Sequence, residues 1–124
     1  MPTEATITVH SLQGHGDVKI INVVGELDET NLPQFEEVLN PLVADESVKV
    51  FIFNLMDLKF MNSKVVGYFA YLYTTLSKFQ RRIIFACYNQ NIKDILQLVG
   101  LDKLVESQAT LEGAIQAAYV MKTQ

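Results

Sequence analysis

The chain is 124 residues long, with 49% hydrophobic residues and a formal net charge of -4. This length predicts a single domain over residues 1–124, and the apolar content is sufficient for a core without disulfides. The ten Lys and Arg residues are scattered, apart from adjacent Arg81 and Arg82. No basic stripe is therefore available for nucleic acid or an anionic membrane, and a protein partner is favoured instead.

The sequence also indicates a cytoplasmic location. The first ten residues lack the basic and apolar regions of a signal peptide, and no apolar run approaches the ~18 residues that span a bilayer. We therefore expect no membrane insertion. Cys87 is the only cysteine, so it has no internal disulfide partner, which fits a reducing compartment.

The first half of the chain predicts a strand pair, a helix and a central strand. Residues 6–10 alternate weakly in polarity and residues 19–24 are β-branched, with glycines between them, which indicates a hairpin or two adjacent strands. Residues 31–43 carry apolar side chains at helical spacing, and Pro41 is expected to end or bend this helix. Residues 48–55 have the composition of a strand buried on both faces at the centre of a parallel sheet.

The second half alternates helices with strands. Over residues 63–79, apolar side chains recur every three to four positions up to Phe79 and predict a helix with one core-facing stripe. The remaining predicted elements are a strand over 82–88, a helix capped by Asn91 that runs through Val99 and stops at Gly100, a short strand at 105–106, and a last helix from Thr110 to Val120 or Met121. This alternation predicts an α/β domain, because parallel neighbours need helical crossovers.

The sequence offers little chemistry for catalysis. His10 and His15 lie in or beside the predicted hairpin without Cys, Asp or Glu at metal-ligand spacing, so no metal site is proposed. Cys87 lies within an apolar strand and is interpreted as core packing, since nothing nearby in the sequence would lower its pKa. Phosphate-binding glycine loops and the GxSxG nucleophile motif are missing. We expect a protein that is not an enzyme and holds no cofactor; an enzyme or ligand carrier would need a deep polar pocket.

One polar triplet stands out between two apolar runs. Asn62, Ser63 and Lys64 follow the predicted central strand and open the predicted 63–79 helix. Such a connection lies at the carboxyl edge of the sheet, where α/β proteins place functional loops. Asn62 or Ser63 is expected to cap the helix, which is worth about 1 kcal/mol. Capping leaves Lys64 unexplained, because a cation at a helix N-terminus opposes the helix dipole.

Three stretches carry a resemblance to a known family. They are Gly25-Glu26-Leu27-Asp28, the segment from Asn54-Leu55 to Gly67, and Leu98-Val99-Gly100-Leu101. They resemble the G-x-[IL]-D turn, the D-L-S-x-[VL]-x-[FY]-[MI]-D-S-[ST]-G-[LI]-G signature and the [LV]-x-G-[LF] step of the STAS domain. This is the fold shared by bacterial anti-sigma factor antagonists and the cytoplasmic tails of sulfate transporters. The resemblance implies a mixed, mostly parallel sheet of four to five strands flanked by about four helices.

The resemblance also implies a function. Ser63 corresponds to the family's phosphoacceptor serine, and antagonists of this type bind an anti-sigma factor that is also a serine kinase until phosphorylation ends the binding. A phosphate would add about -1.5 to -2 charges, which the helix N-terminus stabilises and a packed protein contact does not tolerate. The alternative is a constitutive STAS scaffold or subunit of a transporter or signalling assembly, in which Ser63 is not phosphorylated.

The triplet departs from the family signature at three positions. Asn62 stands in place of the aspartate, Lys64 in place of the second serine or threonine, and Val65 in place of the glycine. The local charge is therefore positive where the family's is negative. A kinase adapted to the acidic form would meet a bulkier, basic surface, whereas Lys64 could instead pair with a phosphate on Ser63. The sequence leaves both interpretations open.

Two tyrosines extend this predicted partner-binding surface. Tyr68 and Tyr71 lie off the core-facing stripe of the 63–79 helix, and amphipathic tyrosines are enriched in protein interfaces. The simpler interpretation is that both rings cover the core with their hydroxyls in water. With Asp28 in the neighbouring loop, as the resemblance implies, the two tyrosines would outline one contact patch with Asn62 and Lys64. Homo-oligomerisation is left open by the sequence.

Overall fold

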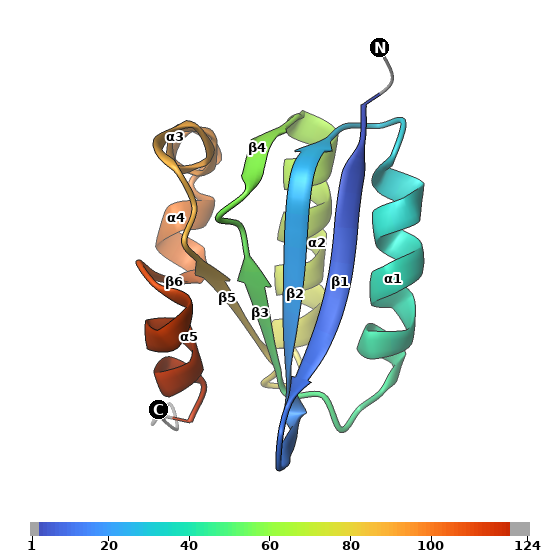
Figure 1. The fold of residues 1–124 in the computed structure, drawn as a ribbon, viewed down its shortest axis with the longest axis vertical. Coiled ribbons are helices and arrows are strands. Elements are labelled where there is room, and N and C mark those ends of the chain that lie inside the picture. Colours follow the sequence, from blue (N-terminus) through green and yellow to red (C-terminus); the bar gives the residue numbers. More distant parts are fainter. Residues whose placement is uncertain (1–2, 120–124) are drawn as a thin grey trace.

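The computed structural model describes residues 3–119, and these residues form one six-stranded sheet with helices on both faces (Figure 1). Hydrogen-bonded neighbours follow the order β1-β2-β3-β5-β6, and β4 pairs with β2 beside this path. The strands are β1 (Ala5–Leu12), β2 (His15–Leu27), β3 (Val50–Asn54), β4 (Leu58–Met61), β5 (Arg82–Ala86) and β6 (Glu106–Gln108). The helices are α1 (Leu32–Ala44), α2 (Ser63–Ser77), α3 (Gln90–Val99), α4 (Leu101–Leu104) and α5 (Leu111–Ala118).

The sheet is mixed and mostly parallel, as the α/β prediction required. Strands β1 and β2 form the predicted hairpin, with Thr8 opposite Asn22, and the other pairs are parallel. Strand β3 lies between β2 and β5 and is buried from Val50 to Phe53, which confirms it as the sheet's centre. Its unbroken apolar composition follows from this position, because both of its faces are covered.

The two faces of the sheet have separate cores. Helices α1, α2 and α3 pack on one face around a cluster of phenylalanines, in which the rings of Phe53 and Phe69 meet edge to face at 5.1 Å. Helix α5 packs Ala114 and Ala118 on the other face, against Ile52 and its neighbours. The fully buried side chains of α5 are therefore small, with Leu111 and Ile115 partly buried beside them, while α1 and α2 bury large side chains completely.

Several predicted element bounds were wrong. Helix α1 continues through Pro41 to Ala44, because Pro41 lies in the last turn, where it disrupts only one turn of the hydrogen-bond ladder. Helix α2 stops at Ser77, and Gln80 takes a left-handed backbone (φ 60°) that turns the chain into β5. Phe79 therefore leaves the predicted core stripe and is 71% exposed.

The segment after β5 also differs from its prediction. Strand β5 ends at Ala86, and Cys87 follows it with a left-handed backbone (φ 66°) and a half-buried side chain, so it lies outside the strand. Burial raises the pKa of the Cys87 thiol and outweighs the smaller lowering by a hydrogen bond with the Leu111 backbone. Asn89, not Asn91, caps α3.

The C-terminal predictions were mostly accurate. Val99, predicted in the apolar stripe of the third helix, is exposed, because the chain leaves α3 at Gly100 in a left-handed conformation (φ 78°). Thr110 caps α5 as predicted, and the predicted end at Val120 or Met121 lies outside the described residues. Within residues 3–119, no helix combines the length and apolar character needed to cross a bilayer.

Candidate functional site

The polar triplet is placed by a strand that the sequence did not predict. Strand β4 pairs in parallel with the end of β2, with Met61 beside Leu27, and the Asn62 N–H donates to the Leu27 carbonyl (3.2 Å). Leu58 and Met61 are buried while the two residues between them are exposed. A backbone ladder therefore holds the triplet at the carboxyl edge of the sheet.

Asn62 is the cap of helix α2. Its side-chain oxygen accepts from the Val65 N–H (3.2 Å), and its extended backbone (φ -91°, ψ 180°) is the usual cap conformation. Ser63 is the first helical residue, and Ser63 and Lys64 are both exposed. Within residues 3–119, the Ser63 side chain has no hydrogen bond. The serine hydroxyl is thus not the cap and is open to solvent.

The loop between β2 and α1 lies against this cap. The Asn62 side-chain amide donates to the Glu29 carboxylate, a contact that sequence reasoning missed because the two residues are 33 positions apart. Hydrogen bonds from Thr30 and then Thr3 hold the pKa of Asp28 below its ordinary value. Asp28 is therefore ionised and engaged within its own loop, one residue from the glutamate that contacts Asn62.

Helix α3 holds β4 from the other side. The side-chain amide of Asn89 donates to the Leu58 carbonyl (3.1 Å), and that of Asn91 donates to the Lys59 carbonyl (2.8 Å). Asn89 also caps α3 through the Ile92 N–H (2.9 Å). Sequence reasoning gave the capping role to Asn91, since two asparagines two positions apart are equivalent signals until the tertiary contacts are known.

The two tyrosines of the predicted patch differ in burial. Tyr71 is 62% exposed, whereas Tyr68 is half-buried and packs edge to face on Phe35 of α1 (5.8 Å between ring centroids). The two tyrosine rings stack at 6.4 Å. Burial, and to a lesser degree Glu36, raises the pKa of Tyr68 to about 12. Tyr68 therefore covers the core, and Tyr71 is the tyrosine available at the surface.

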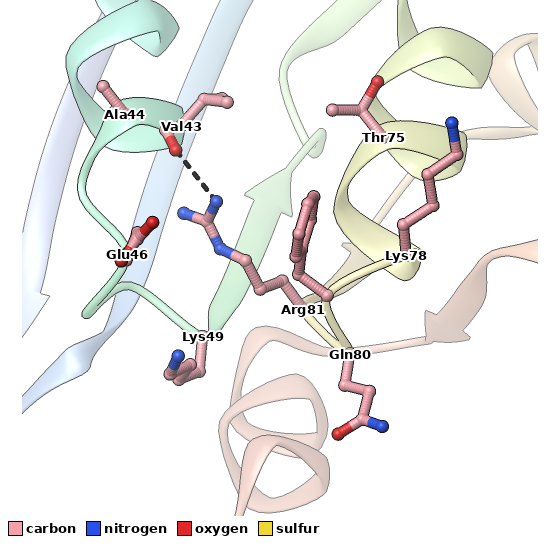
Figure 2. A pocket seen from close by; sticks show the side chains of 9 residues that line it. Val43, Ala44, Glu46, Lys49, Thr75, Lys78, Gln80 and Arg81 are labelled. Carbon is pink, nitrogen blue, oxygen red and sulfur yellow. Dashed lines mark hydrogen bonds between the residues drawn. The ribbon is translucent and has the colours of Figure 1, made fainter.

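A depression of roughly 660 Å³ lies at the other end of the parallel strands, where β3 and β5 begin (Figure 2). It is open to solvent, and Lys49, Lys78 and Glu46 are among the residues that line it. Arg81 points from its wall toward the end of α1 and donates to the Val43 carbonyl (2.8 Å), so its guanidinium holds backbone together. Among residues 3–119, no group of three potential ligands could hold a metal.

Comparison with known proteins agrees with this architecture. The STAS domain family model matches residues 10–114. An anti-sigma factor antagonist from Mycobacterium paratuberculosis has a similar structure, with a TM-score of 0.83, 26% identity, and coverage of 94% of this chain and 96% of that one. Unphosphorylated SpoIIAA, also an anti-sigma factor antagonist, aligns with a TM-score of 0.78 and 22% identity over 94% of this chain and 100% of that one. The phosphorylated form of SpoIIAA from Bacillus aligns with a TM-score of 0.72 and 23% identity over 91% and 99%. None of the curated proteins compared with this sequence matches it.

Proposed function

Because the chain belongs to the STAS domain family, we propose that it is a cytoplasmic, non-enzymatic anti-sigma factor antagonist whose binding to an anti-sigma kinase is switched by phosphorylation of Ser63. Several of its structural neighbours are anti-sigma factor antagonists. In this proposal the unmodified protein binds the kinase, and the phosphorylated protein does not. The domain spans residues 1–124 and requires neither metal nor cofactor.

The observation that carries the proposal is that Asn62, and not Ser63, caps helix α2. Asn62 supplies the cap, so the Ser63 hydroxyl is exposed and has no structural role in the helix. The backbone N–H groups of Ser63 and Lys64 precede the first capped N–H of the helix and can donate to a phosphate. Modification would thus add a dianion without removing a contact of the fold.

The partner-binding surface in this proposal surrounds Ser63. It consists of Asn62 and Lys64 beside the serine, Asp28 in the adjoining loop, and the tyrosines of α2. Tyr71 offers most of the exposed aromatic surface, and Tyr68 supports it from below. Lys64 follows the serine directly and is exposed, and in this proposal its ammonium would pair with a phosphate on Ser63 and favour the modified state.

A second candidate is favoured by the three departures from the family signature. Asn62, Lys64 and Val65 remove the acidic, glycine-containing form on which a kinase of this family would act. In this reading the protein is a constitutive STAS scaffold or subunit, and Ser63 is never phosphorylated.

Phosphorylation by a native kinase separates the two functions. We expect intact-mass spectrometry to show one added phosphate after incubation with ATP and the partner kinase, and Ser63→Ala to abolish it. Ser77→Ala is the matched control, because Ser77 is an exposed serine at the other end of the same helix. Labelling that persists in Ser63→Ala, or no labelling by any kinase that the protein binds in its native cells, would favour the scaffold.

A further inference from the structure

The two edges of the sheet are unlike each other. Strand β6 is three residues long and begins with Glu106, which forms an ion pair with Arg82 of the next strand. Strand β1 is eight residues long, pairs only with β2, and contains no Lys, Arg, Asp, Glu or Pro. Native proteins usually protect a free edge with charge, proline or short length. Strand β1 has none of these devices among its described residues.

The free hydrogen-bonding groups of this edge can be assigned from the ladder. Glu26 N–H donates to the Glu4 carbonyl (3.0 Å), so the even-numbered residues of β1 face β2. The odd-numbered residues, including Ile7 and Val9, therefore present their backbone N–H and C=O groups outward. The one contact that the structure shows on this row is a side-chain hydrogen bond from Gln34 to the Ala5 carbonyl (3.3 Å).

The side chains on β1 separate into two rows. Ala5, Ile7 and Val9 pack against the core beneath the sheet, and Thr6, Thr8 and His10 are exposed on the other face. If two β1 strands pair in antiparallel orientation, the apolar side chains of both strands lie on one face of the joined sheet. The polar side chains of both strands lie on the other face. The strand also contains no Lys, Arg, Asp or Glu that would repel the same residue of its own copy.

We propose that strand β1 is a homodimerisation edge, on which a second copy of this chain adds its own β1 in antiparallel orientation. The register that pairs all outward-facing residues places Ile7 opposite the second copy's Val9, with the twofold axis at Thr8. Each Ile7–Val9 pair then exchanges two backbone hydrogen bonds, and the two Thr8 side chains lie directly opposite each other. The two sheets become one continuous sheet. Ser63, at the end of α2, is not part of the seam.

Charges placed at the twofold axis test this geometry. In sedimentation equilibrium of the full chain, we expect the wild type to approach twice its 14.0 kDa mass as concentration rises. Thr8→Lys and Thr8→Glu should each raise the dimer dissociation constant about fivefold or more, because like charges meet at the axis. An equal mixture of the two variants should associate at least as tightly as the wild type, because opposite charges then meet.

Two controls separate the seam from general effects. Thr8→Ala removes the same weak hydrogen bond from Asn22 (3.3 Å) without adding charge, and it should dimerise like the wild type. Gln116→Lys adds a charge on the exposed face of α5, which packs by β3, β5 and β6 and lies away from β1 (Figure 1), and it should also leave dimerisation unchanged. A wild type that stays monomeric up to about millimolar concentration, or dimerisation that Thr8→Lys does not weaken while circular dichroism shows a native fold, would overturn the proposal.

Discussion

The two ends of helix α2 are built in opposite ways. At its N-terminal end, Ser63 and Lys64 are exposed, and the hydrogen bonds that hold them run through Asn62, whose side chain caps the helix and contacts Glu29 and whose N–H donates to the Leu27 carbonyl. At its C-terminal end, the buried Arg81 donates to four backbone carbonyls, at Leu42, Val43, Asp45 and Val48, and stacks over Phe51. One end is exposed, while the other is fixed by buried hydrogen bonds. If the proposed function is right, the residues that bind the partner and the residues that stabilise the fold lie at opposite ends of one helix.

The largest expected effect is at the C-terminal end of α2. Arg81→Ala would remove the guanidinium hydrogen bonds of four carbonyls, of which only that of Asp45 is known to keep another donor, the Val48 N–H, so the free energy of unfolding should fall by roughly 3–4 kcal/mol. Urea unfolding followed by circular dichroism measures this loss. Lys78→Ala, in the same depression but exposed, should change stability by about 0.5 kcal/mol or less. A loss of unfolding free energy below about 1 kcal/mol in Arg81→Ala would contradict the stabilising role of these Arg81 hydrogen bonds.

A smaller effect is expected at the cap. Asn62→Ala removes the acceptor of the Val65 N–H and the donor to Glu29, and should cost about 1 kcal/mol. Asn62→Asp keeps the cap acceptor but places a second carboxylate against Glu29, so it should lie between the wild type and Asn62→Ala. If Asn62→Asp proves more stable than the wild type, the contact with Glu29 is not stabilising.

Ser63→Ala should be nearly neutral for folding. The serine is the first helical residue and is not the cap, so we expect a change in unfolding free energy of about 0.5 kcal/mol or less. The same urea titration measures it. A loss as large as that of Asn62→Ala would mean that the Ser63 hydroxyl stabilises the helix. It would contradict the assignment of the capping role to Asn62 alone.

Tyr68 should make the stability of the fold depend on pH only in alkali. The folded-state pKa of about 12 lies above the ordinary value of 10.0, so the folded protein holds this proton more tightly between those values. Its stabilising contribution is complete below pH 10 and is lost as pH rises toward 12. Tyr68→Phe should therefore lose less stability over this range than the wild type. Tyr71→Phe is the control, and an equal response of both variants would contradict the burial of Tyr68.

Periodicity and composition predicted most of the fold. The apolar spacing of α2, the apolar run 50–53 of β3 and the left-handed glycine at Gly100 are local features that can be recognised in the sequence itself. Strand β4 was missed because four residues that are apolar only at their ends carry no clear period of two. The prediction that Phe79 lies in the core stripe of the helix was wrong because the chain turns at Gln80. This left-handed turn contains no glycine that would have predicted it from the sequence.

The candidate site was located from the sequence but not completed. The order of strand, polar triplet and helix in the sequence predicts that Ser63 lies at the carboxyl ends of the parallel strands. Glu29 and Asn89, which hold the cap and β4, lie about 30 residues from their partners, and no local pattern reports such contacts. The choice between Asn62 and Ser63 as cap was likewise open until the backbone geometry was known.

The pairing of β4 with β2 fixes the backbone that leads into Ser63. The segment before Ser63 is a ladder of backbone hydrogen bonds, joined to β2 at Met61 and to the start of α3 through two asparagine amides. A group added to the first turn of α2 would leave this frame in place, since none of its bonds involves the serine side chain. A molecule docking there would meet the same backbone before and after such an addition, and the difference would be confined to the added group and its electric potential.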